Sequence, residues 1–444
     1  MRVSPRPAGD HRPNLVLITI DSLRSDHLGV YGYPRPTSPQ IDAFAREAVV
    51  VSDAITQAPY TKAAVASLLT GLFPTAHKTY TTSVPLRLLQ PSGSVGSATV
   101  QQTDVLSADL PTLPASLQAA GYHTIAFSAN PYLIPDFGFA HGFDTFTYVK
   151  GEDAVYAHAD EMMALATKAV AQAPQPFFLW VHLMDTHNPY TPPEPYRSML
   201  PPLTPARPID PSHIPDYLRI GNSNDLNLYL ARYDAGARAA DTAIGRFFSA
   251  LRASHLWDQT GVVVTADHGE GFMEHNLMSH NNSLYDELLH VPLIIKLPGL
   301  TPRKVHAQVQ LADLFPTLAR VAGASVPKTL HGFDIMPVLT GTGSAEPYAY
   351  AELVGARFAL RALDWKIIAS FQGGRELFNL KSDHGEAANL ARTDLAETDR
   401  LEHVLARALA MAIKDGEKTP HRQIPVSPLV LERLRALGYI GAGR

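Results

Sequence analysis

The chain has 444 residues, of which 18% are charged, and its formal net charge is -5. This balance excludes the strongly basic surface that binding to nucleic acid or an anionic membrane requires, and the length predicts one large domain with a smaller one appended. Cysteine is absent, which excludes disulfides, thiolate metal sites and a cysteine nucleophile.

The N-terminal segment MRVSPRPAGDHRPN is basic and rich in proline. No apolar stretch that resembles the core of a signal peptide follows it, because the run LVLITI is short and is interrupted by Asp21. No segment approaches the roughly 18 consecutive apolar residues of a membrane span. We therefore expect a soluble, cytoplasmic chain.

Short apolar runs rich in β-branched residues alternate with helical patterns along the chain. The predicted strands cover residues 14–22, 123–130, 177–187, 261–269 and 291–299. Apolar residues recur at helical spacing between them, at 58–72, 111–121 and 231–253. This alternation predicts an α/β fold with a large, mostly parallel sheet sandwiched by helices. In such a sheet the polar residues that follow parallel strands meet at one edge.

Two long segments are predicted to be loops. Residues 82–108 are rich in Ser, Thr and Gly, and residues 189–215 contain ten prolines, which excludes regular structure. Loops of this length are lids, binding loops or disordered segments. After about residue 345 the pattern changes to short apolar runs followed by a helix-like stretch at 387–413. We therefore predict a catalytic α/β domain over 1–345 and a C-terminal α+β subdomain over 346–444.

Three ligand-type side chains follow two of the predicted strands. Asp21 closes the first strand, and Asp267 and His268 close the fourth. Taken alone, an aspartate at a strand end is more often a turn former or a helix cap than a ligand. Two carboxylates and one imidazole at the same edge of a sheet, however, form a donor set suited to Zn²⁺ or Mn²⁺ more than to Ca²⁺.

The Ala-rich helical run at 58–72 opens on a hydroxyl and a cation, Thr61 and Lys62. A hydroxyl at the first helical position lies beside unpaired backbone N–H groups and the positive end of the helix dipole. If the ion bound by the strand-end residues also touched Thr61, an alkoxide nucleophile would form. The alternatives are that Thr61 only caps the helix, and that Lys62 is either a substrate ligand or a solvated charge.

Several histidines form a second group of candidates. His187 follows the third predicted strand, while His275 and His280 follow the pair Asp267 and His268. Each of the three could donate to a substrate oxygen or protonate a leaving group, or could be a structural histidine. We assign His182, which lies inside the same strand as His187, to structure.

At these residues the chain resembles the sulfatase family of the alkaline phosphatase superfamily. The segments that carry the resemblance are ITIDSLRSDHLGVYGYPRPTSPQIDAFA, TKAAVASLLTG, VHLMDTHNPYTPP, TADHGEGFMEH and HNNSLYDELLHVPLIIKLPG, with the C-terminal landmarks QLADLFPTLARVAG, ELFNLKSDHGEAANLA and ALGYIG. The resemblance runs nearly end to end. It implies an alkaline-phosphatase-like fold and a metal-dependent enzyme that acts on sulfate or phosphate esters.

The chain departs from the family pattern at the nucleophile. Thr61 stands where sulfatases carry a Cys or Ser that is converted to formylglycine, so formylglycine is not expected here. The usual arginine, proline and second aspartate are replaced, and the usual substrate segment is replaced by SANPYL, which leaves Asn130 as a polar contact; the three replacing residues are Val65, Ala63 and Ser22. A threonine nucleophile with Asp–His ligands is similar to relatives that handle phosphate esters, such as lipoteichoic acid synthases and phosphoethanolamine transferases.

These features lead to one main hypothesis. A single divalent ion, Mn²⁺ or Zn²⁺ ahead of Mg²⁺ or Ca²⁺, is held by Asp21, Asp267, His268 and the Thr61 oxygen. Thr61 attacks a phosphate ester, or less favourably a sulfate ester, of a small, lipid-linked or glycan-linked molecule. His187 or His280 protonates the leaving oxygen, and the expected substrate ligands are Lys62, Asn130 and His275.

Two other hypotheses stay open. The first is a catalytically degenerate member that binds an anionic ligand or acts as a scaffold, which the loss of the arginine, the proline and the second aspartate favours. The second is a two-metal enzyme with Asp185, His187 and His280 at the second ion. The spacing Asp-x-His does not resemble the family's second metal site, and we rank this hypothesis last.

Overall fold

The computed structural model describes residues 9–80, 102–151, 156–344, 346–353 and 356–437. An eight-stranded sheet forms its centre, with the strand order β11-β2-β10-β7-β1-β6-β4-β5. Only β10 runs antiparallel to its neighbours, which confirms a mostly parallel α/β fold. In this order the strands are β11 (Arg303–Gln310), β2 (Val49–Ile55), β10 (His290–Lys296), β7 (Thr260–Ala266), β1 (Asn14–Ile20), β6 (Phe177–Leu183), β4 (His123–Ser128) and β5 (Thr145–Tyr148).

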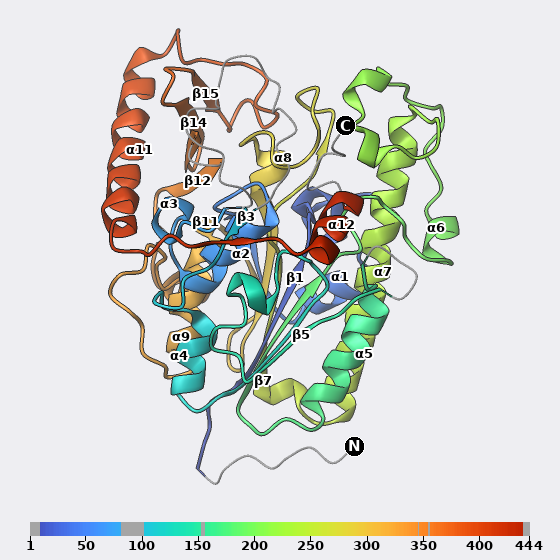
Figure 1. Cartoon of the computed structure of the whole chain (residues 1–444), viewed down its shortest axis with the longest axis vertical. Helices are drawn as coiled ribbons and strands as arrows, with labels where there is room; N and C mark the ends of the chain where they lie inside the picture. Colours follow the sequence, from blue (N-terminus) through green and yellow to red (C-terminus); the bar gives the residue numbers. More distant parts are fainter. Residues whose placement is uncertain (1–8, 81–101, 152–155, 345, 354–355, 438–444) are drawn as a thin grey trace.

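Helices cover both faces of this sheet (Figure 1). One face carries α1 (Pro39–Ala45), α5 (Ala159–Val170) and α7 (Leu226–Ala253). The other face carries α2 (Thr61–Thr70), α4 (Leu113–Ala119) and α9 (Leu314–Val321). Helix α7 begins five residues before the predicted start because the Asp225 side chain accepts a hydrogen bond from Asn227 N and caps it.

The central strands are buried along their whole length and mostly apolar, because both faces of the sheet are covered. Every residue of β1, β6 and β7 is buried. Their continuous Val, Ile, Leu and Phe runs are typical of parallel strands between two helical layers. Each of the five predicted strands is present as β1, β4, β6, β7 or β10, and the polar residues predicted at their ends lie in the loops that follow.

Helix α2 explains the Ala-rich run that opens on Thr61. All of its residues are buried, so small side chains are needed on every side of it. The backbone is extended at Tyr60 and becomes helical at Thr61. The helix is ended by Gly71, whose φ of 67° is the left-handed conformation that glycine favours. Its N-terminus therefore places the Thr61 hydroxyl and the first backbone N–H groups of the helix at the carboxyl edge of the sheet.

A small antiparallel sheet forms the C-terminal part of the chain. It consists of β12 (Ala349–Leu353), β13 (Arg357–Ala362), β14 (Trp365–Ser370) and β15 (Arg375–Asn379) and packs against α11 (Leu395–Gly416). Helix α11 begins eight residues after the predicted start, because Asp394 caps it and the preceding residues form turns. The division of the chain at 345/346 remains a prediction.

The proline-rich segment 189–215 contains more regular structure than predicted. A short helix, α6 (Tyr196–Met199), and one 3₁₀ turn (Pro211–His213) lie within it, and Pro195 and Pro211 stand beside or at the starts of these two elements, where a missing N–H costs nothing. Most of the other predicted loop, residues 82–101, lies outside the described residues, as does most of the landmark ALGYIG. The described end of the predicted loop 82–108 contains β3 (Gln102–Asp104), which pairs with β16 (Gln423–Pro425).

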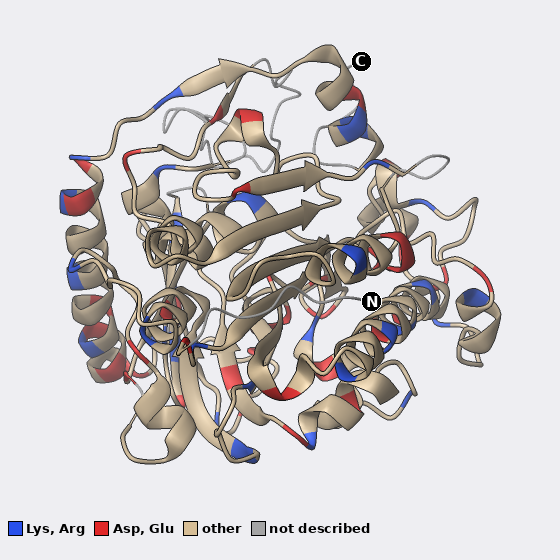
Figure 2. Cartoon of the chain, turned by 90° about the horizontal axis from the view of Figure 1, so that it is seen from below, with Lys and Arg blue, Asp and Glu red and all other residues tan. Residues whose placement is uncertain are grey.

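The remaining elements are short, apart from the C-terminal helix. They are α3 (Pro74–His77), β8 (Gly271–Phe272), β9 (Met278–Ser279), α8 (Asp286–Leu289), α10 (Met336–Thr340) and α12 (Pro428–Ala436). Basic and acidic residues are interspersed along the ribbon of the chain (Figure 2). No helix among the described residues is both long and apolar enough to cross a membrane.

Candidate active site

The register of β1 and β7 brings the three predicted metal ligands together. Ile20 lies beside Ala266 in this parallel pair, so the next residues along, Asp21 and Asp267, leave the sheet side by side. His268 follows directly. Ligand atoms of these three side chains all lie within 4.8 Å of one another, and all three side chains are buried.

We call Asp21, Asp267 and His268 the site cluster. The Nε2 atom of His268 lies 3.6 Å from Asp21 Oδ1 and 3.5 Å from Asp267 Oδ2. Asp267 Oδ1 accepts hydrogen bonds from the backbone N–H groups of Ser22 and His268. Asp267 Oδ2 has no hydrogen-bond partner among the described residues, although it is buried. An unsatisfied buried carboxylate oxygen beside a second carboxylate and an imidazole fits a divalent cation.

The electrostatics of the site cluster point to a missing positive charge. Burial, together with the nearby charge of Asp21, raises the pKa of Asp267. Burial also raises the pKa of Asp21, but the imidazoles of His187 and His182 more than offset this and hold that pKa well below its usual range. Burial lowers the pKa of His268 to about 4, so its ring is neutral and able to ligate at neutral pH.

Thr61, the first residue of α2, lies next to the site cluster. Its Oγ1 atom is 3.3 Å from Asp21 Oδ2 and 3.2 Å from His268 Nε2. The helix-start position fixes this hydroxyl, because the backbone conformation changes from extended to helical between Tyr60 and Thr61. A nucleophile held this way would need no reorganisation before attack.

Asp21 is held by more donors than the sequence indicated. Asn130, expected to contact substrate, donates from Nδ2 to Asp21 Oδ2 at 2.8 Å. Ser22, at the position of the family's second aspartate, donates from Oγ to Asp21 Oδ1 at 2.9 Å. His182, which we assigned to structure, places Nε2 3.1 Å from Asp21 Oδ2. His182 is thus buried inside a strand, as a structural residue would be, and it also contacts a predicted ligand.

His187 and His280 lie beside the site cluster. The His280 ring centroid is 4.6 Å from that of His268 and 5.0 Å from that of His187. His280 Nδ1 lies 3.1 Å from Glu270 Oε1, and Tyr190 donates its hydroxyl to Glu270 Oε2 at 2.9 Å. Burial lowers the pKa values of His187 and His280 to about 4 and raises that of Glu270 to about 7.

Sequence reasoning missed Glu270, although a signal was present. It follows the Asp-His-Gly turn, so its backbone must lie near the ligands. The close approach of this turn to its neighbour is visible at Gly269, where a Cβ atom would lie 1.9 Å from Glu287 O. Only glycine fits there, and the tight turn brings the Glu270 side chain back toward His280.

Lys62, expected to be a substrate ligand or a solvated charge, is buried and has other partners. Its Nζ atom donates to Thr103 Oγ1 and to Asp104 O, both at 2.5 Å, and lies 4.6 Å from the centre of the Phe137 ring. Consecutive residues on a helix point about 100° apart, so Lys62 faces β3 while Thr61 faces the cluster. We do not carry Lys62 forward as a substrate ligand.

His275 also has other partners. Its Nδ1 atom lies 2.7 Å from Glu287 Oε1, and its ring stacks on Tyr285 with a centroid distance of 3.6 Å. Burial lowers the pKa of His275, but hydrogen bonding to Glu287 more than offsets this and raises it. These contacts give His275 a structural role, and we no longer propose it as a substrate ligand.

The two-metal hypothesis is not supported by the position of Asp185. Its Oδ2 atom accepts a hydrogen bond from Ala159 N at 2.8 Å, and its Oδ1 atom lies 3.2 Å from His158 Nδ1. Asp185 thus holds the N-terminus of α5. Among the described residues, the only group of three or more ligand-type side chains close enough to hold an ion is the site cluster.

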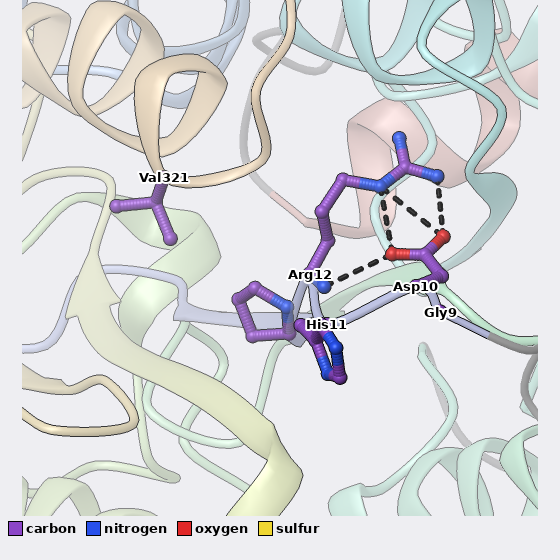
Figure 3. Close-up of a pocket in the computed structure, with 6 residues that line it drawn as sticks. Gly9, Asp10, His11, Arg12 and Val321 are labelled. Carbon is purple, nitrogen blue, oxygen red and sulfur yellow. Dashed lines mark hydrogen bonds and ion pairs between the residues drawn. The ribbon is translucent and has the colours of Figure 1, made fainter.

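A surface pocket at the other end of β1 is unrelated to the site. It is lined by Asp10, Arg12, Val321 and their neighbours, which precede β1 or end α9, whereas Asp21 follows β1. Figure 3 shows the Arg12 guanidinium paired with the Asp10 carboxylate at its rim. This ion pair satisfies both charges locally.

Comparisons with known proteins agree with the fold. The family model Sulfatase matches residues 13–324, and the model N-sulphoglucosamine sulphohydrolase, C-terminal, matches residues 274–414. Delta 4,5-hexuronate-2-O-sulfatase of Bacteroides thetaiotaomicron is 25% identical over 94% of this chain and 91% of that protein. Arylsulfatase K of Xenopus laevis is 29% identical over 53% of this chain, and the match spans only 52% of that relative.

Solved structures show the same architecture. The phosphonate monoester hydrolase of Agrobacterium radiobacter superposes with a TM-score of 0.72 at 20% identity, over 94% of this chain and 100% of that chain. The Sulfatase model covers more than half of the chain, including Asp21, Thr61, Asp267 and His268. The chain therefore belongs to the Sulfatase family, a family of metal-dependent ester hydrolases in the alkaline phosphatase superfamily.

Proposed function

We propose that this protein hydrolyses or transfers anionic esters with Thr61 as the nucleophile. The observation that carries the proposal is the position of Thr61 Oγ1, 3.3 Å from Asp21 and 3.2 Å from His268 in a fully buried cluster. The residue at the N-cap of α2 is Tyr60, so Thr61 is the first residue of the helix rather than its cap.

Asp21, Asp267, His268 and the Thr61 oxygen would hold one divalent ion. A bound ion would lower the pKa of the Thr61 hydroxyl and offset negative charge on the ester. The imidazole in the donor set favours Mn²⁺ or Zn²⁺ over Mg²⁺ or Ca²⁺. The unpartnered Asp267 Oδ2 atom supports this choice of residues.

The reaction follows from the side chains beside the cluster. Thr61 gives its proton to neutral His280, which Glu270 holds, or to His187, and its Oγ1 forms a bond to phosphorus or sulfur as the bond to the leaving oxygen breaks, in line with the attack. The protonated histidine then gives this proton to the leaving oxygen. Water or an acceptor alcohol next attacks the threonine ester, and the same histidine takes the proton of the attacking group and passes it to Thr61 Oγ1 as the bond between that oxygen and phosphorus or sulfur breaks.

Phosphate esters are the favoured substrates. The combination of a threonine nucleophile with an Asp–His ligand pair supports phosphoryl transfer, as the resemblance to phosphate-handling relatives implies. The structural likeness to a phosphonate monoester hydrolase is compatible with this preference. Sulfate esters are the second candidate, because the matching sequences carry the names of sulfatases. The esterified molecule would be small, or would be linked to a lipid or a glycan.

A turnover panel tests this proposal. Aryl phosphate, aryl phosphodiester, aryl phosphonate and aryl sulfate would each be offered with Mn²⁺, Zn²⁺, Mg²⁺ or Ca²⁺. We expect the phosphorus esters to be turned over fastest with Mn²⁺ or Zn²⁺, and mass spectrometry of quenched protein to find the transferred group on the peptide containing Thr61. A labelled peptide elsewhere in the chain would contradict the proposed nucleophile.

A degenerate, anion-binding protein is the second candidate function. It is favoured by the side chains already bonded to Asp21, from Asn130, Ser22 and His182, and by the buried Val65 in place of the family's arginine. Metal analysis of the purified protein separates the two. A protein that contains and retains no divalent ion, and turns over none of the four esters, supports the degenerate reading.

A further inference from the structure

His182 lies in β6, one of the central strands of the sheet, and contacts Asp21 of the site cluster. It is fully buried in β6 and stands opposite Thr19 of β1 in the parallel register. Its Nε2 atom lies 3.1 Å from Asp21 Oδ2, and its Nδ1 atom lies 2.8 Å from Thr19 Oγ1. Both ring nitrogens therefore face a specific partner.

A third side chain fixes the direction of these hydrogen bonds. Trp180 Nε1, which can only donate, points at Thr19 Oγ1 at 3.0 Å. Thr19 has one hydrogen to give, and its two acceptors are His182 Nδ1 at 2.8 Å and Val181 O at 3.4 Å. The shorter contact assigns the hydrogen to His182 Nδ1.

The tautomer of His182 follows from this assignment. If Nδ1 accepts a hydrogen bond, the ring hydrogen is on Nε2, and Nε2 donates to Asp21. The opposite neutral tautomer would place a lone pair of Nε2 against a carboxylate oxygen. The chain of donors thus runs in one direction, from Trp180 through Thr19 and His182 to Asp21.

We propose that His182 is a positioning residue that sets the orientation of Asp21 for the cation, with its tautomer fixed by Thr19 and Trp180. Together with Asn130, which donates to the same oxygen at 2.8 Å, it prevents rotation of the Asp21 carboxylate. This proposal rests on the proposed metal site. Partners that orient a metal ligand are worth about 10- to 100-fold in metal affinity.

The experiment measures Mn²⁺ affinity by titration calorimetry on four variants of the full chain. His182→Leu removes the donor, and we expect Mn²⁺ affinity to fall about 10- to 100-fold. His182→Gln places an amide nitrogen near the position of Nε2, and we expect it to keep affinity within about 3-fold of the unchanged protein. Thr19→Val removes the donor to Nδ1, and we expect an intermediate loss.

Leu179→Ala is the matched control. Leu179 lies on the same strand and is also fully buried, but it makes no hydrogen bond to the site cluster. It loses core packing, so its melting temperature falls, and its Mn²⁺ affinity should not change. Equal affinities in His182→Leu and the unchanged protein would overturn the proposal, as would equal losses in His182→Leu, His182→Gln and Leu179→Ala.

A second measurement does not need the cation. Imidazole ¹⁵N spectra of the metal-free protein should report the Nε2–H tautomer for His182, and a mixture of tautomers in Thr19→Val. An Nδ1–H ring in the unchanged protein would overturn the proposal even if the metal site is correct. If the unchanged protein binds no ion, the metal site fails instead, and an Nε2–H tautomer would then show that the directed chain of donors exists without it.

Discussion

Two groups of buried acidic side chains differ in how their charge is balanced. In the site cluster, Asp21 and Asp267 are surrounded by imidazoles, and no lysine or arginine pairs with them among the described residues. In the second group, which we call the inter-sheet cluster, Asp286 pairs with Lys366 at 2.8 Å and with Arg361 at 3.1 Å, and Lys366 also pairs with Glu386 at 2.8 Å.

The pKa values of the two groups differ accordingly. Burial raises the pKa of Asp286, but Lys366 and Arg361 more than offset it and hold that pKa well below its usual range. Asp267 has no such cation, and burial with the charge of Asp21 raises its pKa. The inter-sheet cluster is complete without a ligand; it joins the small sheet to α8 and, through the pair of Arg361 with Asp53 at 2.8 Å, to β2. The site cluster is incomplete, which is what a cation-binding site requires.

The largest expected effect is on catalysis at the incomplete cluster. Thr61→Ala should lower kcat about 10⁴-fold or more, because no other hydroxyl occupies the nucleophile position, while Thr61→Ser should keep measurable turnover. Both variants should unfold at nearly the same denaturant concentration as the unchanged protein. Turnover in Thr61→Ala close to that of the unchanged protein would refute the proposed nucleophile.

The complete cluster should respond in stability instead. Lys366→Met leaves Asp286 and Glu386 without their shared cation, and we expect the free energy of unfolding to fall by about 3–5 kcal/mol. Urea unfolding measures this. Arg375→Met is the control, since it removes a half-exposed partner of Glu402 and should cost less than about 1 kcal/mol. Similar losses in both variants would show that the inter-sheet cluster is no stronger than a surface pair.

Removing a charge from the site cluster should affect the stability of the metal-free protein differently from Lys366→Met, because no loss of stability is expected. Asp267→Asn removes one of two neighbouring like charges, so the metal-free variant should be as stable as the unchanged protein or more stable. Adding Mn²⁺ at 100 times its Kd should stabilise the unchanged protein by about 2.7 kcal/mol and the variant far less. A large loss of metal-free stability in Asp267→Asn would mean that the two clusters are alike.

Lys62 provides the smallest and most specific test, through pH. Burial lowers its pKa from 10.5 to about 7, and the nearby charge of Asp104 offsets only part of this shift; its ammonium donates to Thr103 Oγ1 and to the Asp104 carbonyl. Between these two pH values the unfolded chain holds a proton that the folded chain lacks, so stability should rise with pH, by at most about 1.4 kcal/mol per unit. Unfolding at pH 7, 8 and 9 should show this slope, and Lys62→Met should lack it.

The fold and the strand-end residues could be predicted because they depend on local pattern. Apolar runs that end in Asp21 and Asp267 place those residues at one edge of any parallel sheet, whatever the strand order. The position of Thr61 followed from the helix that it opens. None of these inferences needed the register of the strands.

The rest depends on register and side-chain direction, which the pattern does not contain. His182 lies in an apolar strand like any core residue, and only its pairing with Thr19 brings it to Asp21. Lys62 adjoins Thr61 but faces another strand. His275 is close to the ligands in sequence, yet a stacking partner, Tyr285, turns it away. The predicted substrate role of Asn130 stays a prediction, since its amide is committed to Asp21.

The tight turn at Gly269 has a consequence for which parts of the protein can evolve. The backbone N–H groups of Gly269 and Glu270 donate to the carbonyls of Leu288 and Glu287, the residues that follow Asp286 on α8. These hydrogen bonds attach the turn that follows Asp267 and His268 to α8, the same helix that anchors the small sheet. In a randomised library selected for activity on a new ester, the recovered substitutions should accumulate on the loops around the leaving group. Few substitutions should be recovered in the turn at Gly269.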